Sequence, residues 1–135
     1  MKIKLKKHIS RIFYVILGFA IIMFVMFQVM KSKTDQALKN QKNIEIDMSK
    51  IRDGIYHGKS NGGMVSVEVE VEVENHVIKD IKLLKHDNAK GKNAETMIDD
   101  MILYNTDNVD IVSGATASSK TIRNAVNNAL QQGLN

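Results

Sequence analysis

The stretch Val65-Ser66-Val67-Glu68-Val69-Glu70-Val71-Glu72-Val73-Glu74 alternates valine with a polar residue at every step. A period of two is the pattern of a β-strand with one buried face and one solvated face. Alternate residues of a strand lie about 6.6 to 6.8 Å apart, so the four glutamates do not converge on a point where a cation could bind. The stretch therefore predicts a strand with a solvated glutamate face, no metal site, and a valine face that needs a cover.

The segments on both sides of this strand predict a small antiparallel sheet. Asn75 and His76 are the expected turn into a second strand over residues 77–84, although such turns prefer Asn-Gly and a slightly longer loop is the alternative. Residues 54–60 are expected to form another strand, which turns at residues 61–63. We interpret His76 as a surface turn residue rather than a ligand.

Two apolar stripes at helical spacing predict the cover of the valine face. They comprise Ala94, Met97, Ile98, Met101 and Ile102 in one segment, and Ile122, Ala125, Val126, Ala129 and Leu130 in the other. Each stripe is more consistent with core packing than with cofactor binding. A sheet with one apolar face and two amphipathic helices gives an α+β fold, in which the small antiparallel sheet is covered by the two helices.

An apolar run of 19 residues, 12–30, is interrupted only by Gly18 and Gln28. It predicts one N-terminal transmembrane helix, since a membrane core needs about 20 apolar residues. Basic residues are more frequent before the run than directly after it, which predicts a cytoplasmic N-terminus and an extracytoplasmic domain. A cleaved signal peptide is the alternative. We favour an uncleaved anchor because a usual signal core has about 7 to 15 residues and because no small-x-small cleavage site follows the run.

The chain therefore divides into four expected parts: a basic cytoplasmic tail (1–11), a transmembrane anchor (12–30), a stalk (31–49) and a folded domain (50–135). The stalk is polar and lacks Pro and Gly, so we expect a partly helical spacer that continues the membrane helix. Residues 1–49 hold nine Lys/Arg and three Asp/Glu, a net charge of +6, whereas residues 50–135 hold ten and twelve, a net charge of −2. The basicity belongs to the anchor.

Two function classes are excluded by composition. A nucleic-acid interface would need a basic patch with stacking aromatic residues on the folded part, which carries only Tyr56 and Tyr104. The chain has no cysteine, which excludes disulfides, haem attachment through Cys-x-x-Cys-His, and thiolate iron–sulfur clusters. If electrons pass through this protein, an organic cofactor must hold them.

The stretch Asp110-Ile111-Val112-Ser113-Gly114-Ala115-Thr116 precedes the second predicted helix. Ser118 or Ser119 is the expected N-cap of a helix that begins near Lys120, which places Thr116 just before free backbone N–H groups that favour anions. Glycine at 114 allows unusual backbone angles, and alanine at 115 is small. The loop could therefore offer the threonine hydroxyl to a large partner.

This stretch resembles the covalent attachment sequence of FMN-binding domains, in which the final threonine carries the flavin. The segment Asp53-Gly54-Ile55-Tyr56-His57-Gly58 is similar to the opening of those domains, and residues 65–84 are similar to their long hairpin. The resemblance covers roughly residues 50–133. It extends to the flavinylated domains in the C subunit of the sodium-translocating NADH:quinone oxidoreductase and in the G subunit of Rnf complexes.

The resemblance implies that FMN is joined through a phosphodiester to Thr116, with Asp110, Ser113, Gly114 and Ala115 as further cofactor-binding residues. Asp110 has two interpretations that stay open: recognition by the modifying enzyme, or an Asx turn that holds the loop.

The resemblance also implies the modifying enzyme itself, a separate Mg-dependent flavin transferase that takes FAD, joins its FMN phosphate to the threonine oxygen and releases AMP. The sequence shows no convincing base beside Thr116, because His57, His76 and His86 belong to the predicted sheet region.

The expected function is that of an electron carrier without catalytic residues of its own, which relays electrons between membrane or extracellular redox partners. Either Tyr56 or Tyr104 could stack on the flavin ring, and Lys120 and Arg123 could pair with the phosphate. One alternative is a membrane-tethered interaction module that holds FMN loosely or not at all. A small flavin reductase is another, but the sequence has neither a nicotinamide motif nor a pocket signature for it.

Overall fold

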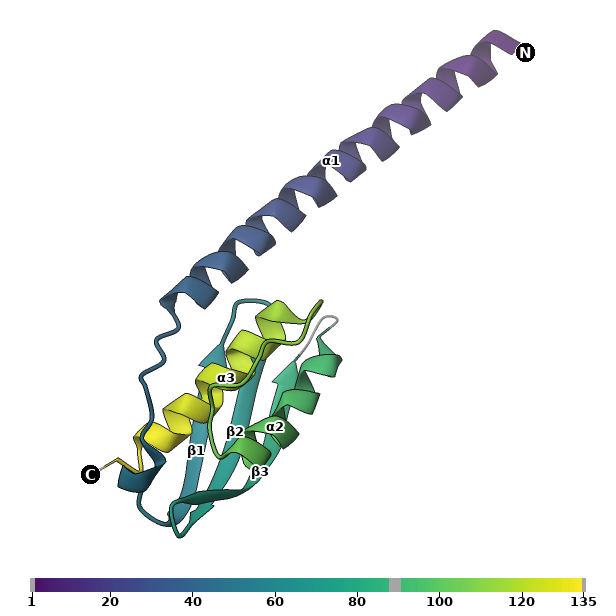
Figure 1. The fold of residues 1–135 in the computed structure, drawn as a ribbon. Helices are drawn as coiled ribbons and strands as arrows, with labels where there is room; N and C mark the ends of the chain where they lie inside the picture. Colours follow the sequence, from purple (N-terminus) through teal and green to yellow (C-terminus); the bar gives the residue numbers. More distant parts are fainter. Residues whose placement is uncertain (1, 88–90, 135) are drawn as a thin grey trace. The chain divides into compact units, whose positions relative to one another are not determined.

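The computed structural model describes residues 2–87 and 91–134, with side chains from residue 8 onward (Figure 1). The chain forms two compact units, Met1–Lys33 and Thr34–Asn135. Helix α1 (Lys2–Asn40) extends across the boundary between the two units. Its residues 2–33 lie in the first unit, and its residues 34–40 belong to the second. The helical continuation that we expected beyond the apolar run is therefore confirmed as far as Asn40.

Helix α1 is long and apolar enough to cross a membrane from His8 onward, and its most apolar part buries nothing within the protein. Its exposed side chains include large apolar residues such as Phe13, Phe19 and Phe24, each about 60% or more exposed. Burying that much apolar surface in lipid rather than water is favourable. The helix is thus a candidate membrane span.

The second unit contains an antiparallel sheet of the three described strands β1 (Gly54–Asn61), β2 (Ser66–Glu74) and β3 (Val77–Asp87), in the order β1-β2-β3. The valines of β2 are at most 2% exposed, as their alternation predicted. Asn75 and His76 both have positive φ, 53° and 63°, so the turn between β2 and β3 is the tight one rather than the longer loop. The ring of His76 also donates from Nδ1 to the carbonyl oxygen of Ile51 at 2.7 Å, which anchors this turn.

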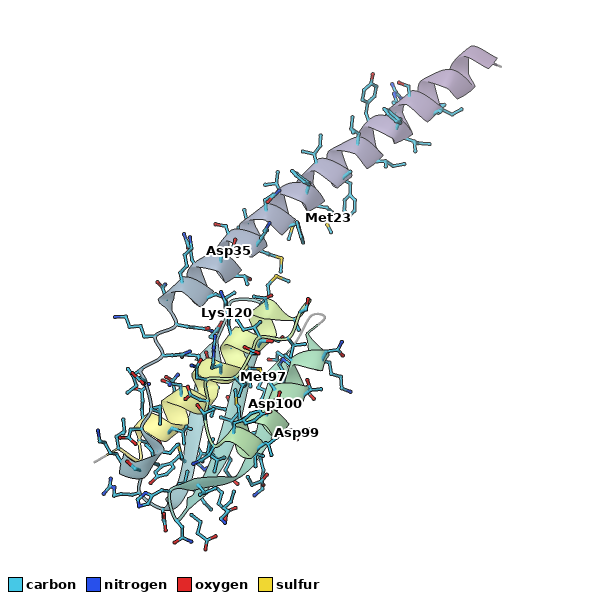
Figure 2. All side chains as sticks on the ribbon, viewed as in Figure 1. Met23, Asp35, Met97, Asp99, Asp100 and Lys120 are labelled. Carbon is cyan, nitrogen blue, oxygen red and sulfur yellow. The ribbon has the colours of Figure 1, made fainter. Side chains whose placement is uncertain are left out.

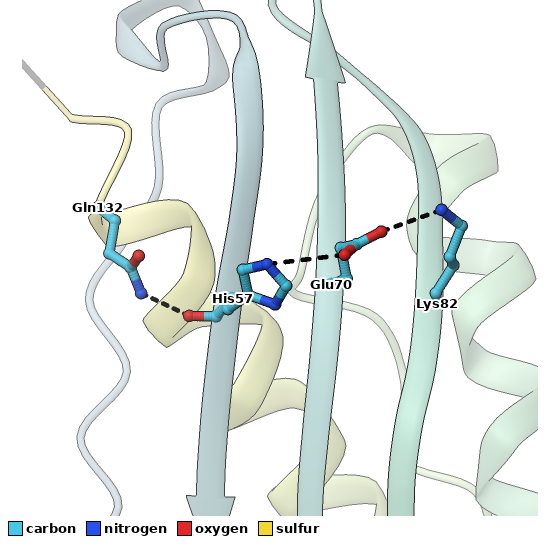
Figure 3. Close-up of polar contacts among 4 residues, drawn as sticks. All are labelled: His57, Glu70, Lys82 and Gln132. Carbon is cyan, nitrogen blue, oxygen red and sulfur yellow. Dashed lines mark hydrogen bonds and ion pairs between the residues drawn. The ribbon is translucent and has the colours of Figure 1, made fainter.

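The open face of the sheet carries a ladder of ion pairs (Figure 3). Glu70 on the central strand lies 3.6 Å from Nε2 of His57 on β1 and 2.9 Å from Nζ of Lys82 on β3. The hydrogen bond from Lys82 lowers the pKa of the Glu70 carboxyl. All three side chains remain in contact with water, so the ladder contributes little to stability. The glutamate face is solvated, as expected.

The valine face is covered by α2 (Met97–Tyr104) and α3 (Thr116–Gln131), which gives the predicted α+β fold. Two short 3₁₀ helices, η1 (Met48–Lys50) and η2 (Lys92–Thr96), precede β1 and α2. Met97 is 1% exposed and turned toward the sheet, whereas Asp99 and Asp100 lie on the outer side of α2 (Figure 2). Helix α3 packs on β1 and β2, and α2 packs on β3.

Residues 41–46, which we expected to be part of a plain spacer, are attached to α3 and form what we call the strap. The side-chain amide of Asn127 accepts from the backbone N–H of Ile44 at 3.1 Å and donates to its carbonyl oxygen at 2.8 Å. Asn124 donates to the carbonyl oxygen of Lys42 at 3.2 Å. The spacer expectation was wrong for these residues, because buried amides of α3 satisfy their backbone groups.

The strap, α3 and the loop after α2 meet at the buried carboxyl of Asp107. Asp107 is 5% exposed and accepts a hydrogen bond from Nδ2 of Asn127 at 2.7 Å. Burial raises the pKa of the Asp107 carboxyl above its ordinary value of 3.8, while the bond from Asn127 and the charge of Arg123 act in the opposite direction. Because the effect of burial is the largest, the pKa of Asp107 is raised overall, and the carboxyl binds its proton more tightly in the folded state than in the unfolded chain.

Asp107→Asn should remove one source of pH dependence from the stability of this unit. Because the folded-state pKa is raised, the contribution of Asp107 is most favourable below pH 3.8 and is lost as the pH rises through the folded pKa. As the pH rises through this range, we expect the free energy of unfolding of the variant to increase relative to that of the parent. Urea unfolding of both proteins between pH 3.5 and about 7 measures it. A constant difference across the range would contradict the assignment.

Candidate functional site

The loop of residues 110–116, which we call the attachment loop after the role that the resemblance implies, ends in a tight turn. The N–H of Ala115 donates to the carbonyl oxygen of Val112 at 3.1 Å, and Gly114 has a φ of 79°. A positive φ at the third position is what a type II turn requires. A Cβ added at Gly114 would have nothing within 4 Å. Glycine is therefore needed here for its backbone angle and not for space.

Helix α3 begins at Thr116, earlier than the expected start near Lys120. Its N-cap is Ala115, which has no side chain to cap the helix, and the N–H of Ser119 already bonds to the carbonyl oxygen of Ala115 at 2.9 Å. The expectation that Ser118 or Ser119 is the N-cap was wrong. Both serines lie inside the helix and are at most 2% exposed. Their hydroxyls instead bond to groups outside the helix, a common use of serine near helix ends.

The two serines hold the first turn of α3 from within. The hydroxyl of Ser119 accepts from the backbone N–H of Val112 at 3.1 Å and so joins the helix to the attachment loop. The hydroxyl of Ser118 lies 3.1 Å from Nε2 of His86 at the end of β3. The loop and the helix start are thus fixed to each other and to the sheet.

Thr116 is exposed and borders a shallow pocket of about 180 Å³. The pocket is lined by Thr34, Met64, Val65, Gly91 and residues 114–118. As the first residue of α3, Thr116 stands where backbone N–H groups have no partner within the helix. Pockets that enclose a drug-sized ligand usually have about 300 to 1,000 Å³. This one is too small to enclose a large planar ring.

Gly114, Ala115 and Thr116 line this pocket together, whereas Asp110 and Ser113 do not. Both of the latter residues are exposed. Within the described residues, no hydrogen bond of the Asp110 side chain is found, so an Asx turn has no support. The carboxylate of Asp110 is available to a partner molecule.

Neither tyrosine of the domain lies at the pocket. The hydroxyl of Tyr56 donates to the carbonyl oxygen of Arg52 at 2.8 Å, and its ring packs near Gly133, beyond the C-terminal end of α3. Tyr104 ends α2, and its neighbour Asn105 bonds to His76 in the hairpin turn. Both rings are therefore at the end of the sheet remote from Thr116. The expectation that one of them stacks on a ring held at Thr116 is not supported.

The two basic residues of α3 have different positions. Lys120 is exposed (Figure 2). As the fourth residue after Thr116 in α3, it lies one helical turn further on the same side of the helix. Arg123 instead donates from Nη1 to Oδ1 of Asn108 at 2.9 Å and to the carbonyl oxygen of Val109 at 3.4 Å. Arg123 thus holds the chain that leads into the attachment loop, and only Lys120 is placed to pair with a group on Thr116.

His86 is the residue that sequence reasoning missed. We assigned it to the sheet region, away from Thr116, but its side chain is 3% exposed and lies against the first turn of α3. It pairs with Val67 across the sheet and so faces the valine side. The bulges at Glu68/Val69 and Glu72/Val73 each add one residue to β3, so together they leave the face of His86 unchanged and set which valine it pairs with. Even spacing from the buried Ile78 is the sequence signal that could have placed His86 on this face.

Comparison with known protein families supports the resemblance found in the sequence. A family model described as FMN-binding domain matches residues 61–131, just over half of the chain. The matched range includes Met64 and Val65 of the pocket, the attachment loop and all of α3. No curated protein and no solved structure matches the chain.

Proposed function

The chain belongs to the family of FMN-binding domains, and we propose that it carries FMN covalently on Thr116 and serves as an electron carrier on the extracytoplasmic side of a membrane. The observation that carries this proposal is the place of Thr116. Thr116 is exposed, begins the 16-residue helix α3 and follows a turn that requires a positive φ at Gly114. An accessible hydroxyl at a fixed position is what attachment of a large group requires.

The start of α3 suits a phosphodiester. Partnerless N–H groups and the helix dipole favour an anion there by about 0.3 to 1 kcal/mol at exposed sites. The first turn contains no acidic residue, and Lys120 adds a positive charge one turn further on. A phosphate on Thr116 would therefore meet favourable electrostatics without a dedicated binding pocket.

The surroundings of Thr116 suit a ring that stays accessible. Met64 and Ile111, 40% and 36% exposed, provide apolar surface near the loop, but the pocket is too small to enclose an isoalloxazine. The flavin would supply the redox chemistry, and the protein would supply position and access. An open site favours a carrier that must approach both donor and acceptor over an enzyme, which needs a closed substrate pocket.

Attachment by a separate flavin transferase fits the environment of the hydroxyl. In that reaction the Oγ1 of Thr116 forms a bond to the FMN phosphorus of FAD, the pyrophosphate bond breaks, AMP leaves, and the hydroxyl proton passes to a base. Within the described residues, no hydrogen bond joins the Thr116 hydroxyl to a basic side chain. A threonine hydroxyl is a poor nucleophile without such a base, so the base would come from the transferase.

The full membrane-anchored chain, co-expressed with a flavin transferase and purified, should gain the mass of FMN less one water. After tryptic digestion the added mass should lie on the peptide spanning residues 93–120, which contains Thr116. Fragmentation of that peptide assigns the modified residue. A colourless protein of unchanged mass would sink the proposal and favour an interaction module. A yellow protein that releases free FMN on denaturation would show binding without covalent attachment.

A further inference from the structure

Three side chains from different elements form a hydrogen-bonded chain behind the attachment site, with its two inner members buried and Glu95 35% exposed. Nδ1 of His86 on β3 lies 2.8 Å from Oε1 of Glu95 on η2, and Nε2 of His86 lies 3.1 Å from Oγ of Ser118 on α3. The His86 side chain is 3% exposed and Ser118 is 2% exposed. We call this chain the relay. It connects the end of the sheet to the helical turn that begins with Thr116.

The direction of the relay follows from its chemistry. An ionised carboxylate only accepts hydrogen bonds, so Nδ1 of His86 carries a hydrogen and donates to Glu95. In the neutral ring Nε2 is then the acceptor, and the hydroxyl of Ser118 donates to it. Glu95 therefore selects the tautomer, and the tautomer selects the orientation of the Ser118 hydroxyl.

The relay has the order of a nucleophile, a base and an orienting carboxylate. Ser118 is nevertheless too buried for a substrate carbonyl or phosphorus to reach its oxygen, at 2% exposure. Gly91 closes over it, because a Cβ at Gly91 would collide with the Oγ and Cβ of Ser118. The exposed hydroxyl in this region belongs to Thr116, two residues earlier.

We propose that His86 is a positioning residue, which fixes Ser118 and thereby sets the direction in which Thr116 presents its hydroxyl to a flavin transferase. This inference rests on the proposed attachment at Thr116. Helix α3 has no side-chain N-cap, so its first turn depends on the bonds that Ser118 and Ser119 make. An uncapped first turn frays readily, and Thr116 is its first residue. Loss of the Ser118 bond would leave the hydroxyl present but poorly directed.

A positioning role predicts a change in kcat of the transferase rather than in KM. The side chain of His86 is 3% exposed and Ser118 is 2% exposed, so these two residues add almost nothing to the surface that a transferase could contact, and we expect binding to be retained. The reacting oxygen must be held within about 3 to 3.5 Å of the phosphorus, and misplacement lowers the rate of the chemical step. Loss of one hydrogen bond to the turn corresponds to a decrease in kcat of about tenfold.

Two substitutions of His86 separate the two ends of the relay. In His86→Gln the side-chain amide reaches the position of Nε2 and keeps the contact with Ser118. In His86→Asn the amide reaches only the position of Nδ1 and keeps the contact with Glu95. The two variants carry the same amide group, but asparagine is one methylene shorter than glutamine, so the hydrogen-exchange comparison below controls for the difference in packing. His57→Gln, on the open face of β1 and 59% exposed, is the control for a histidine outside the relay.

Initial rates of FMN attachment to the full chain, at varied chain concentration with transferase and Mg-FAD, test the inference. We expect kcat of His86→Asn to fall about tenfold with KM unchanged, and kcat of His86→Gln and His57→Gln to stay within about twofold of the parent. Ser118→Ala should behave as His86→Asn does. Equal kcat values for the asparagine and glutamine variants would overturn the positioning role.

Hydrogen exchange of the unmodified chain supplies a readout that needs no flavin. In His86→Asn, the hydrogen-bonded amides of residues 119–122 should exchange faster than in His86→Gln, while amides of β2 stay equally protected. Faster exchange in β2 as well would show a global loss of stability and would also overturn the inference. If the parent chain accepts no FMN at all, the proposed function fails, and the exchange comparison still decides whether the relay orders the turn.

Discussion

Thr116→Ala should abolish covalent attachment of FMN, whereas Thr116→Ser should retain it. The alanine variant lacks the oxygen that forms the phosphodiester, so no amount of transferase can compensate. Serine keeps that oxygen at the same point of α3, where the side chain is exposed and has room. The measurement is intact mass together with flavin absorbance after co-expression with the transferase.

The matched control is Thr96→Ala. Thr96 is an exposed threonine of the same tryptic peptide, and its hydroxyl donates to the carbonyl oxygen of Asn93 at 2.9 Å. This variant should carry the full adduct. Because Thr116 is exposed, Thr116→Ala should also unfold at nearly the same denaturant concentration as the parent. An adduct that persists in Thr116→Ala would mean that another residue carries the flavin, and the assignment would be wrong.

Gly58→Ala should destabilise the folded unit by about 3 kcal/mol, at the upper end of what overpacking usually costs. A Cβ at Gly58 would lie within 2.9 Å of both the carbonyl carbon of Ala125 and Cβ of Ala129, and closer still to the carbonyl oxygen of Ala125. The backbone of α3 cannot yield as a flexible side chain could. Helix α3 would have to move away from β1. Because α3 covers the valine face of the sheet, this movement would expose part of that face. Denaturant unfolding measures the loss.

Gly114→Ala serves as the control for this substitution. It adds the same methyl group at a site with open space but with a φ of 79°, so its cost is the backbone strain alone, about 1 kcal/mol. We therefore expect Gly58→Ala to be clearly the more destabilising of the two. The reverse order would show that α3 does not pack on β1 as closely as the structure has it.

The parts of the fold that the sequence predicted are those with a local signal. The valine alternation defined β2 and its buried face, and positive φ at Asn75 and His76 agrees with the predicted tight turn. The apolar stripe from Ile122 to Leu130 identified the core side of α3, where all these positions are buried. Periodicity is a property of neighbouring residues, so these elements could be found without knowledge of their partners.

The candidate site was only partly predictable for the same reason. The sequence pointed to the attachment loop, but the start of α3 at Thr116 depends on bonds from Ser118 and Ser119 to groups outside the helix. The preference of serine for N-caps is a weaker local rule than those tertiary bonds. Likewise, Tyr56 and Tyr104 are separated from the pocket by the length of the sheet, which no spacing in the chain indicates.

The sequence by itself determined the α+β class, the candidate membrane helix and the loop in which a threonine follows a permissive glycine. Only the tertiary structure decided that His86 stands behind Ser118, that Asn124 and Asn127 bind the strap, and that Gly58 touches the backbone of α3. Each of these contacts joins residues far apart in the chain. These contacts depend on the register of the strands, on the residue at which a helix starts and on the distance between two backbones. All three are determined only when the whole core packs.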